Sequence, residues 1–205
     1  MSRLHHVRVD RPEGHEPWWH ALPTEPPPAN RWVGSQLEPI LIGVSEELVE
    51  VVTAAGKTTA IVSRGDVLAG NLWHRTAFVI VRSSTGAVLA HRRAETKRIA
   101  PGKWDLGFGG AVHAGESYEA AAARELLEEA GISTPIHFVG DYVYEGPDSR
   151  EVGRMFETVS DGPFQHPPDE VIESTFVDPA DLTEFLASHD FCDAAIHVMV
   201  PVLRS

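Results

Sequence analysis

Three glutamates in one short segment have the type and spacing needed for metal-dependent chemistry. Glu125, Glu128 and Glu129 fall within about one and a half turns of a helix that the sequence predicts over residues 118–130. Ser117 is its expected N-cap, and Gly131 is its expected left-handed stop. Such close carboxylates repel one another, and the C-terminal end of a helix disfavours negative charge. A hard divalent cation, Mg²⁺ or Mn²⁺, would relieve this crowding.

The same helix also permits an ordinary interpretation as a solvated amphipathic helix. Its expected core face consists of Ala120, Ala123, Leu126, Leu127 and Ala130. The glutamates then occupy the opposite, exposed arc. Arg124 precedes Glu128 by four residues, the spacing of a helical ion pair worth a few tenths of a kcal/mol. The helix alone therefore does not decide between a solvated charged face and a metal site.

A longer pattern around the helix favours the metal site. Gly110 is followed after five residues by Glu116, and after seven more by the run Arg124-Glu125-Leu126-Leu127-Glu128-Glu129-Ala130-Gly131-Ile132. This pattern resembles the complete box of the Nudix hydrolase superfamily, and no position departs from it. The resemblance implies an α/β fold, an α/β/α sandwich with a mixed β-sheet. It also implies hydrolysis of a phosphoanhydride bond in a nucleoside diphosphate linked to another moiety, with Mg²⁺ or Mn²⁺ as cofactor.

The resemblance implies roles for the residues of the box. Glu128 and Glu129 are expected to be the principal metal ligands, and Glu125 either a ligand or the base that activates water. In Nudix enzymes the carbonyl at the first glycine of the box can serve as a further ligand, which here is that of Gly110. Arg124 would orient the carboxylates beside it.

Two more glutamates are candidate catalytic residues outside the metal-binding turn. Glu116, at the entrance to the helix, would support the metal shell or its water network. Nudix enzymes often supply another glutamate from a loop late in the fold, and Glu170 is the first candidate here, ahead of Glu145 and Glu173.

A basic segment leads into the box. Five of the seventeen lysines and arginines lie within twelve positions: Arg92, Arg93, Lys97, Arg98 and Lys103. In a chain with a net charge of −13 this concentration predicts an electrostatic funnel for an anion, although an ordinary exposed loop would look the same. Arg92, Arg93 and Lys103 are the candidate contacts to substrate phosphates.

Composition limits the class of protein. A chain of 205 residues is long enough for one domain with a sizeable core. The net charge of −13 argues against nucleic acid as a partner and leaves a small phosphorylated substrate. Cys192 has no second cysteine with which to form a disulfide, and no apolar run reaches the length of a membrane span. The N-terminus has no signal-peptide pattern, so a cytoplasmic enzyme is expected.

The chain is expected to divide at about residue 36. Residues 1–36 are rich in proline and histidine and predict an extension without its own core, and residues 37–205 predict the Nudix domain. That domain opens with a hairpin over residues 37–64, with strands at 48–52 and 58–62. The hairpin and the tryptophans of the extension are candidate contacts of a homodimer. Arg64-Gly65-Asp66 is expected to be a turn.

Further elements are expected from local patterns. They are a strand buried on both faces at 76–81, paired strands at 136–144 and 152–160, a strand at 172–177, a helix ending near Ser188, and a terminal helix at 191–203 broken by Pro201. Trp104 is expected in the core or a cleft wall, and His197 is expected to be packed.

Two alternatives to a Nudix hydrolase remain at this point. Residues 72–78, 92–93 and 101–104 also resemble isopentenyl diphosphate isomerase. That chemistry needs a cysteine acid/base after the tryptophan, where this chain has Gly109 and Ala111. The second alternative is a Nudix-like module that senses a nucleotide without cleaving it. The full set of catalytic carboxylates disfavours this alternative, because a sensor has no need for them.

Overall fold

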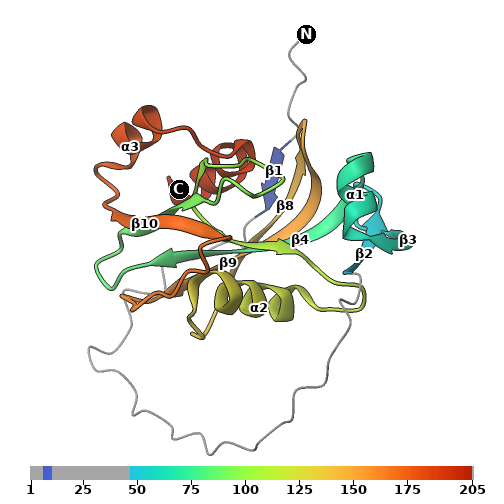
Figure 1. The fold of residues 1–205 in the computed structure, drawn as a ribbon, viewed down its shortest axis with the longest axis horizontal. Coiled ribbons are helices and arrows are strands. Elements are labelled where there is room, and N and C mark those ends of the chain that lie inside the picture. The colour runs from blue at the N-terminus through green and yellow to red at the C-terminus, as the bar shows by residue number, and fades with distance from the viewer. Residues whose placement is uncertain (1–6, 11–46, 205) are drawn as a thin grey trace, which may run out of the picture.

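The structure, a computed structural model, describes residues 7–10 and 47–204 (Figure 1). Its strands are β1 (Val7–Asp10), β2 (Leu48–Val52), β3 (Thr58–Ser63), β4 (Trp73–Arg82), β5 (Val88–Arg93), β6 (Trp104–Asp105), β7 (Phe108–Ala111), β8 (His137–Glu145), β9 (Arg150–Val159) and β10 (Val171–Val177). Its helices are α1 (Arg64–Gly70), α2 (Tyr118–Ala130), α3 (Leu182–Ser188), the π-helix η2 (Ala195–Met199) and α4 (Val200–Leu203).

A mixed sheet forms the middle layer of the fold. Its strands run in the order β1-β8-β9-β4-β2-β3, with β5 and β7 also paired to β4, and β6 and β10 paired to β5. The central pair, β4 and β9, is parallel, whereas the other pairings are antiparallel. The predicted paired strands β8 and β9 are thus confirmed.

Helices cover both faces of this sheet. Along β4 the side chains of Val79 and Val81 enter one core with α2, whereas Ile80 enters a second core with η2 and α4. All three are 0% exposed, as expected of a strand covered on both faces. In Figure 1, α2 lies below the sheet, and α3 lies above it with the C-terminal helices. The α/β/α sandwich expected from the sequence is confirmed.

The hairpin β2–β3 joins the sheet beside β4 and is followed directly by α1. Val49 pairs with Val62 in the hairpin, and Val51 pairs with His74 of β4. The prediction of a turn at Arg64-Gly65-Asp66 was wrong, because these residues form the first turn of α1. The Ser63 hydroxyl accepts a hydrogen bond from the Asp66 N–H at 3.1 Å, so a good N-cap starts a helix here.

Helix α2 has the predicted bounds but buries a different face. Ser117 accepts from the Ala120 N–H at 3.1 Å, and Gly131 ends the helix with φ 69°. The buried residues are Ala121, Ala122, Glu125, Leu126, Glu129 and Ala130. Three residues of the predicted core face, Ala120, Ala123 and Leu127, are exposed. The prediction placed all glutamates away from the core, whereas the helix packs against β7 with two of them turned inward.

The C-terminal segment also differs from expectation. Residues 191–203 do not form a helix broken at Pro201, because η2 passes into α4 and Pro201 lies in the first turn of α4. A proline is tolerated near the start of a helix, and here it follows the wider turn of the π-helix η2. Helix α3 ends at Ser188 as predicted. Trp104, expected in the core or a cleft wall, is partly buried at the border of the core, where its ring lies edge-on to that of Phe185 with the ring centroids 5.1 Å apart.

Part of the N-terminal extension joins the sheet. Residues 7–10 form β1, which pairs antiparallel with β8, so Val7 lies opposite Tyr144. The predicted domain boundary at residue 36 and the tryptophans at 18, 19 and 32 lie outside the described residues. Among the helices of the described residues, none has the length and apolar character to cross a membrane.

A buried ion pair ties the two central strands together. Arg82 of β4 donates through Nη2 to Glu157 of β9 at 2.9 Å, and both side chains are less than a tenth exposed. The two residues lie 75 positions apart in the chain. Removing only one partner of such a pair strongly destabilises the fold, because the other charge is left buried and unpaired.

Candidate active site

One cleft of about 560 Å³ collects most of the residues that the sequence singled out. The α2 carboxylates form one wall, the segment from β5 to Lys97 a second, and the N-terminal hairpin with α1 a third. Its lining residues are Glu47, Arg64, Arg93, Lys97, Gly109, His113, Arg124, Glu125, Glu128, Glu129, Pro167, Asp169 and Glu170. A volume of this size is typical of a small-molecule site.

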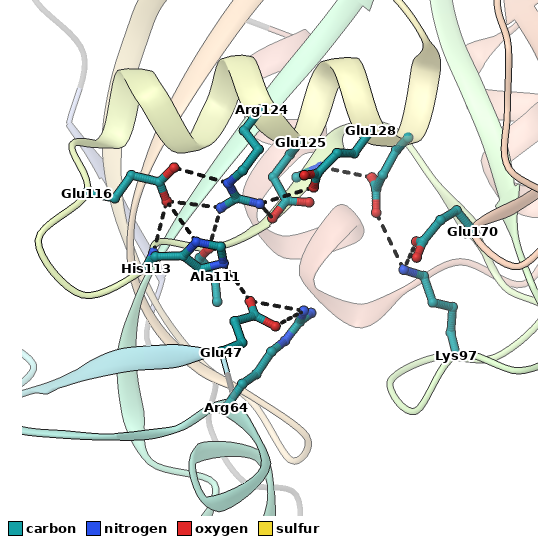
Figure 2. A network of polar contacts seen from close by, with 12 residues as sticks. Glu47, Arg64, Lys97, Ala111, His113, Glu116, Arg124, Glu125, Glu128 and Glu170 are labelled. Atoms are coloured by element: carbon teal, nitrogen blue, oxygen red, sulfur yellow. Dashed lines mark hydrogen bonds and ion pairs between the residues drawn. The ribbon is translucent and has the colours of Figure 1, made fainter. Parts of the chain in front are cut away.

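Arg124 organises the carboxylates around it (Figure 2). Its Nη1 donates to Glu125 at 2.7 Å and to Glu128 at 3.2 Å. Its Nε and Nη2 each donate to one oxygen of Glu116 at 3.0 Å, and Nη2 also reaches the Ala111 carbonyl at 3.1 Å. Arg124 therefore connects Glu116, Glu125 and Glu128 through hydrogen bonds, contacts of the kind that the expected orienting role requires.

The same contacts set the ionisation of Glu116. Partial burial opposes its charge, but the hydrogen bonds from Arg124 and from the His113 N–H lower the pKa of Glu116 below its usual value. Glu116 is thus an anion that anchors the arginine. It is not among the residues that line the cleft.

Glu125 and Glu129 are buried carboxylates with perturbed acidity. Glu125 is 7% exposed and Glu129 is 5% exposed. Burial raises the pKa of Glu125, although the Arg124 charge opposes this shift. Burial and the nearby charge of Glu125 raise the pKa of Glu129 to about 7, although Lys97 opposes this shift. Groups perturbed in this way by burial and by one another are typical of functional sites.

Lys97 bridges two acidic elements across the cleft. Its Nζ contacts Glu170, which lies in the loop before β10, and reaches Glu129 of α2 at 3.5 Å. The bridge brings the late-loop glutamate expected from the sequence to the edge of the α2 cluster (Figure 2). Burial lowers the pKa of Lys97, and the charge of Glu129 partly opposes that shift.

Two glycines let β7 lie close to its neighbours, Gly110 to the Glu125 side chain of α2 and Gly109 to β4. A Cβ on Gly110 would lie 2.7 Å from Glu125 Oε1, and a Cβ on Gly109 would lie 2.1 Å from the Ala77 carbonyl oxygen. The Gly109 N–H donates to Glu129 Oε2 at 3.2 Å. The absence of a Cβ at Gly109 therefore lets β7 lie close to β4, and its absence at Gly110 leaves room for the Glu125 carboxylate. Gly109, and not the predicted ligand Gly110, belongs to the cleft lining.

The basic segment does not act as a single patch. Arg93 and Lys97 line the cleft, whereas the candidate phosphate contacts Arg92 and Lys103 do not. Neighbouring strand residues point to opposite faces, so Arg92 turns away from Arg93 and contacts Glu95 and Glu173 instead. Lys103 contacts Asp190 at 3.2 Å. Their chain positions are close to the site, but their side chains are directed elsewhere.

Two other candidates for the late-loop glutamate also lie outside the cleft lining. Glu145 pairs with Arg150 at 3.0 Å at the end of the β8–β9 hairpin, and Glu173 lies 3.6 Å from Arg92. Glu170 is therefore the one of the three candidates that the fold brings to the site.

The hairpin side of the cleft was not anticipated. Glu47 and Arg64 come from the two ends of the hairpin, and His113 comes from the loop that precedes α2. Glu47 accepts from Arg64 Nη1 at 3.0 Å and contacts His113 Nε2 at 3.0 Å. No local pattern marks these residues, because their proximity depends on how β2 docks: the Ala114 N–H donates to the Leu48 carbonyl at 2.9 Å.

The donor set of the cleft fits a hard divalent cation. Of the six carboxylates in its lining, the sequence singled out four, Glu125, Glu128, Glu129 and Glu170; carboxylates offer only oxygen, which Mg²⁺ and Mn²⁺ prefer. Among the residues that the structure describes, no three acidic, histidine or cysteine side chains form a group that could hold a metal ion, and these carboxylates instead pair with Arg124 and Lys97. Two of the four are nevertheless buried with raised pKa values, the state that a bound cation would relieve.

Comparisons with known proteins agree with this geometry. A family model described as NUDIX domain matches residues 72–196. YfcD of Escherichia coli K12, described as an uncharacterized Nudix hydrolase, is 36% identical over 140 residues, which cover 68% of this chain and 78% of YfcD. An uncharacterized Nudix hydrolase of Yersinia pestis is 36% identical over 138 residues, or 67% of this chain and 76% of its own length.

Solved structures show the same fold. DR0079 from Deinococcus radiodurans matches with a TM-score of 0.63 at 20% identity, over 77% of this chain and 98% of that one. The MutT protein of Methanosarcina mazei Go1 matches with a TM-score of 0.55 at 25% identity, over 64% and 93% of the two chains. The box is intact, three of its glutamates line one cleft, and the family model covers more than half of the sequence, so this chain belongs to the Nudix hydrolase family.

Proposed function

We propose that this protein hydrolyses a phosphoanhydride bond in a nucleoside diphosphate linked to another moiety, with Mg²⁺ or Mn²⁺ as cofactor. Nudix hydrolases cleave pyrophosphate bonds and in general use divalent cations. The observation that carries the proposal is that Glu125, Glu128, Glu129 and Glu170 line one cleft together with cationic side chains. Phosphoryl transfer needs this combination of metal ligands and positive charge.

Each group of residues then has a chemical role. Glu128, Glu129 and Glu170 would hold the cation, and Glu125 would be a further ligand or the base that accepts a proton from water. When bound, the cation would acidify water and neutralise charge on the phosphates. Arg124 keeps the neighbouring carboxylates oriented through contacts of 2.7–3.2 Å.

The two cationic side chains of the β5 wall are placed to receive phosphate. Arg93 and Lys97 line the same cleft as the carboxylates. Lys97 is held by Glu129 and Glu170, and it would be freed for a phosphate when those carboxylates bind a cation. These two residues therefore replace Arg92 and Lys103 as our candidates for substrate binding.

The isomerase alternative is not favoured. Cys192 is 6% exposed, packs in the core on the C-terminal side of the sheet, and is absent from the cleft lining. Burial and the charge of Asp105 raise the pKa of this thiol far above its usual value. The described site therefore lacks the cysteine acid/base that isomerisation needs.

A substrate panel tests the proposal. Purified protein is incubated with nucleoside diphosphates and triphosphates, nucleotide sugars, dinucleoside polyphosphates and coenzyme conjugates, with Mg²⁺, Mn²⁺ or EDTA, and products are identified by chromatography and mass spectrometry. ADP-ribose belongs in the panel because the NUDIX domain of Shewanella oneidensis NrtR, which shares this fold at 17% identity with a TM-score of 0.51, is known in complex with it. Metal-dependent release of a phosphorylated product is expected. Tight binding without turnover would instead favour the sensing module.

Two further expectations stay predictions. The homodimer is checked by light scattering of the full chain across a concentration series. The cytoplasmic location is checked by fractionation of the source cells.

A further inference from the structure

A positively charged side chain from outside the Nudix box reaches the cleft from the hairpin side. Arg64 is the first residue of α1, and its side chain lines the cleft with the carboxylates of α2. Its backbone is fixed, because the Arg64 N–H donates to the Glu47 carbonyl at 2.8 Å and the preceding Ser63 caps the helix. Figure 2 shows Arg64 approaching from the side opposite α2.

Arg64 is the most accessible of the cationic side chains in this lining. It is 43% exposed, whereas Arg93, Lys97 and Arg124 are 15%, 19% and 22% exposed. The three less exposed cations are each held by an acidic residue at the foot of the cleft or below it. A ligand entering from solvent therefore meets the Arg64 guanidinium first.

The guanidinium also has donors to spare. Among the described residues it donates only through Nη1, to the two oxygens of Glu47 at 3.0 and 3.3 Å. Nε and Nη2 have no acceptor among those residues. Arg124, by contrast, uses Nε, Nη1 and Nη2 on its neighbours. Arg64 can thus accept a second anion without first losing its present partner.

Its partner holds it in a defined orientation. Glu47 contacts both Arg64 Nη1 and His113 Nε2 at 3.0 Å, and His113 follows the strand that carries Gly109 and Gly110. The arginine is therefore tied to the same loop that leads into the catalytic helix. Orientation before binding reduces the entropy lost when a ligand is bound.

We propose that Arg64 binds a phosphate group of the substrate, opposite Arg93 and Lys97, and thereby sets the affinity for diphosphate-containing compounds. The inference rests on the proposed function, since it assigns a substrate contact to that same site. An arginine fork matches two phosphate oxygens with parallel hydrogen bonds, and charged bonds of this kind are stronger than neutral ones. The exposed Arg64–Glu47 pair contributes little by itself, so sharing the arginine with a phosphate costs little.

The contact is tested by calorimetric titration, in the presence of Mg²⁺, with methylenediphosphonate, an analogue of diphosphate that cannot be hydrolysed. Arg64→Ala is expected to weaken binding about 10- to 100-fold, the range for a charged hydrogen bond, and Arg64→Lys is expected to weaken it less. Lys57→Ala is the matched control, because it removes one positive charge from the exposed turn of the same hairpin, away from the cleft. It is expected to leave the dissociation constant unchanged.

Glu47→Gln separates a substrate contact from a merely structural ion pair. Both Glu47→Gln and Arg64→Ala break that pair, but only Arg64→Ala removes the phosphate-binding group. Glu47→Gln is expected to bind the ligand at least as tightly as the wild type does, because the removal of a negative charge beside the ligand outweighs the orientation that Glu47 gives to Arg64. If it weakened binding as much as Arg64→Ala did, or if Arg64→Ala bound as the wild type does, the inference would be wrong.

Failure of this inference is distinguishable from failure of the proposed function. Turnover in the substrate panel together with binding that ignores Arg64→Ala would overturn only the Arg64 contact. If the titration showed binding that Arg64→Ala weakens, but no compound of the panel were turned over, only the proposed hydrolysis would be overturned. The phosphate contact of Arg64 would still be supported.

Discussion

Glu128 and Glu129 are neighbours in sequence but stand in different environments. The Glu128 side chain is 56% exposed at the rim of the cleft, and that of Glu129 is 7% exposed beneath Lys97. An exposed carboxylate can bind a cation with little loss of its own hydration, whereas a buried carboxylate has a stronger electrostatic interaction with the cation. Both are needed if one cation is to be held between solvent and the foot of the cleft.

Replacing either glutamate is expected to abolish most turnover. Glu128→Gln and Glu129→Gln should each lower kcat by about 10²-fold or more, the range for a lost transition-state electrostatic contact. Steady-state kinetics on the best compound of the panel measures this, and circular dichroism checks the fold. Glu119→Gln is the control, because Glu119 lies on the exposed side of the same helix and pairs with Arg154. Near-normal rates in both site variants would refute the assignment.

The raised pKa of Glu129 makes the stability of the metal-free protein depend on pH. Its pKa is about 7 in the fold and 4.5 in the unfolded chain, so between these values the folded state binds more protons. The contribution of this group to the free energy of unfolding should therefore be fully present below pH 4.5 and be lost as pH rises through about 7, a loss of about 1–3 kcal/mol.

Urea unfolding in EDTA at several pH values measures this dependence. The difference between wild type and Glu129→Gln isolates the contribution of Glu129, since glutamine does not titrate. Parallel pH curves for the two proteins would show that the Glu129 carboxyl is not destabilised by burial.

At the scale of elements, local chemistry predicted where helix α2 begins and ends but not which side it buries. Ser117 and Gly131 act on the nearest backbone groups, so their effect is visible in sequence. Alanine fits either side of a helix, so Ala120 and Ala121 gave no guide to the buried face. Burial of Glu125 depends on Arg124 and on the approach of Gly110, a contact between separate elements.

The same limit explains the basic segment and the hairpin. Successive side chains of a strand point to opposite faces of the sheet, so Arg92 and Arg93 of β5 are directed apart. The period of two shows that only one of these two arginines can face the cleft, but because the rest of β5 is buried on both faces it does not show which. Arg64, however, reaches the site only because the hairpin docks beside His113, and no residue pattern within 47–64 indicates that.

The C-terminal stop of α2 provides a test at this scale. Gly131→Ala places a Cβ at φ 69° and within 2.7 Å of Gln165 Cβ. Gly115→Ala is the matched control, because its φ is 80° and nothing lies within 4 Å of the added atom. Both substitutions should lower the free energy of unfolding by about 1–2 kcal/mol, because alanine is strained in the left-handed backbone conformation. Gly131→Ala should lose more, because Gln165 must also move.

Urea denaturation of the two variants and the wild type gives the comparison. Equal losses would mean that the segment around Gln165 adjusts freely and does not pack firmly on the end of α2. A smaller loss for Gly131→Ala would contradict the contact altogether.

For the whole molecule, the fold class followed from one motif of 23 residues. The box predicted the helix and the family, and periodicity predicted β4, β8 and β9, whereas the short strand β7 was not predicted. The sequence did not predict that residues 7–10 would add a strand at the far edge of the sheet. Pairing between distant segments depends on the assembled sheet, and a run of four residues carries too little pattern to reveal it.

Cation binding should stabilise the whole fold. Mg²⁺ at about ten times its dissociation constant contributes about 1.4 kcal/mol, which raises Tm by about 3–6 °C in a protein of this size. Differential scanning calorimetry at pH 8 measures the shift against NaCl of equal ionic strength. Glu129→Gln should show a smaller shift. An unchanged Tm at saturating Mg²⁺ and Mn²⁺ would mean that neither ion binds the folded chain.

The parallel pairing of β4 with β9 has a consequence for biosynthesis. Arg82 leaves the ribosome 75 residues before Glu157, so its charge has no buried counter-ion while the intervening segments emerge. The centre of the sheet cannot close until β9 is synthesised, and contacts so far apart in the chain form slowly. The nascent protein should therefore remain sensitive to protease until β9 has emerged, and it should gain its cleft only in the last stage of translation.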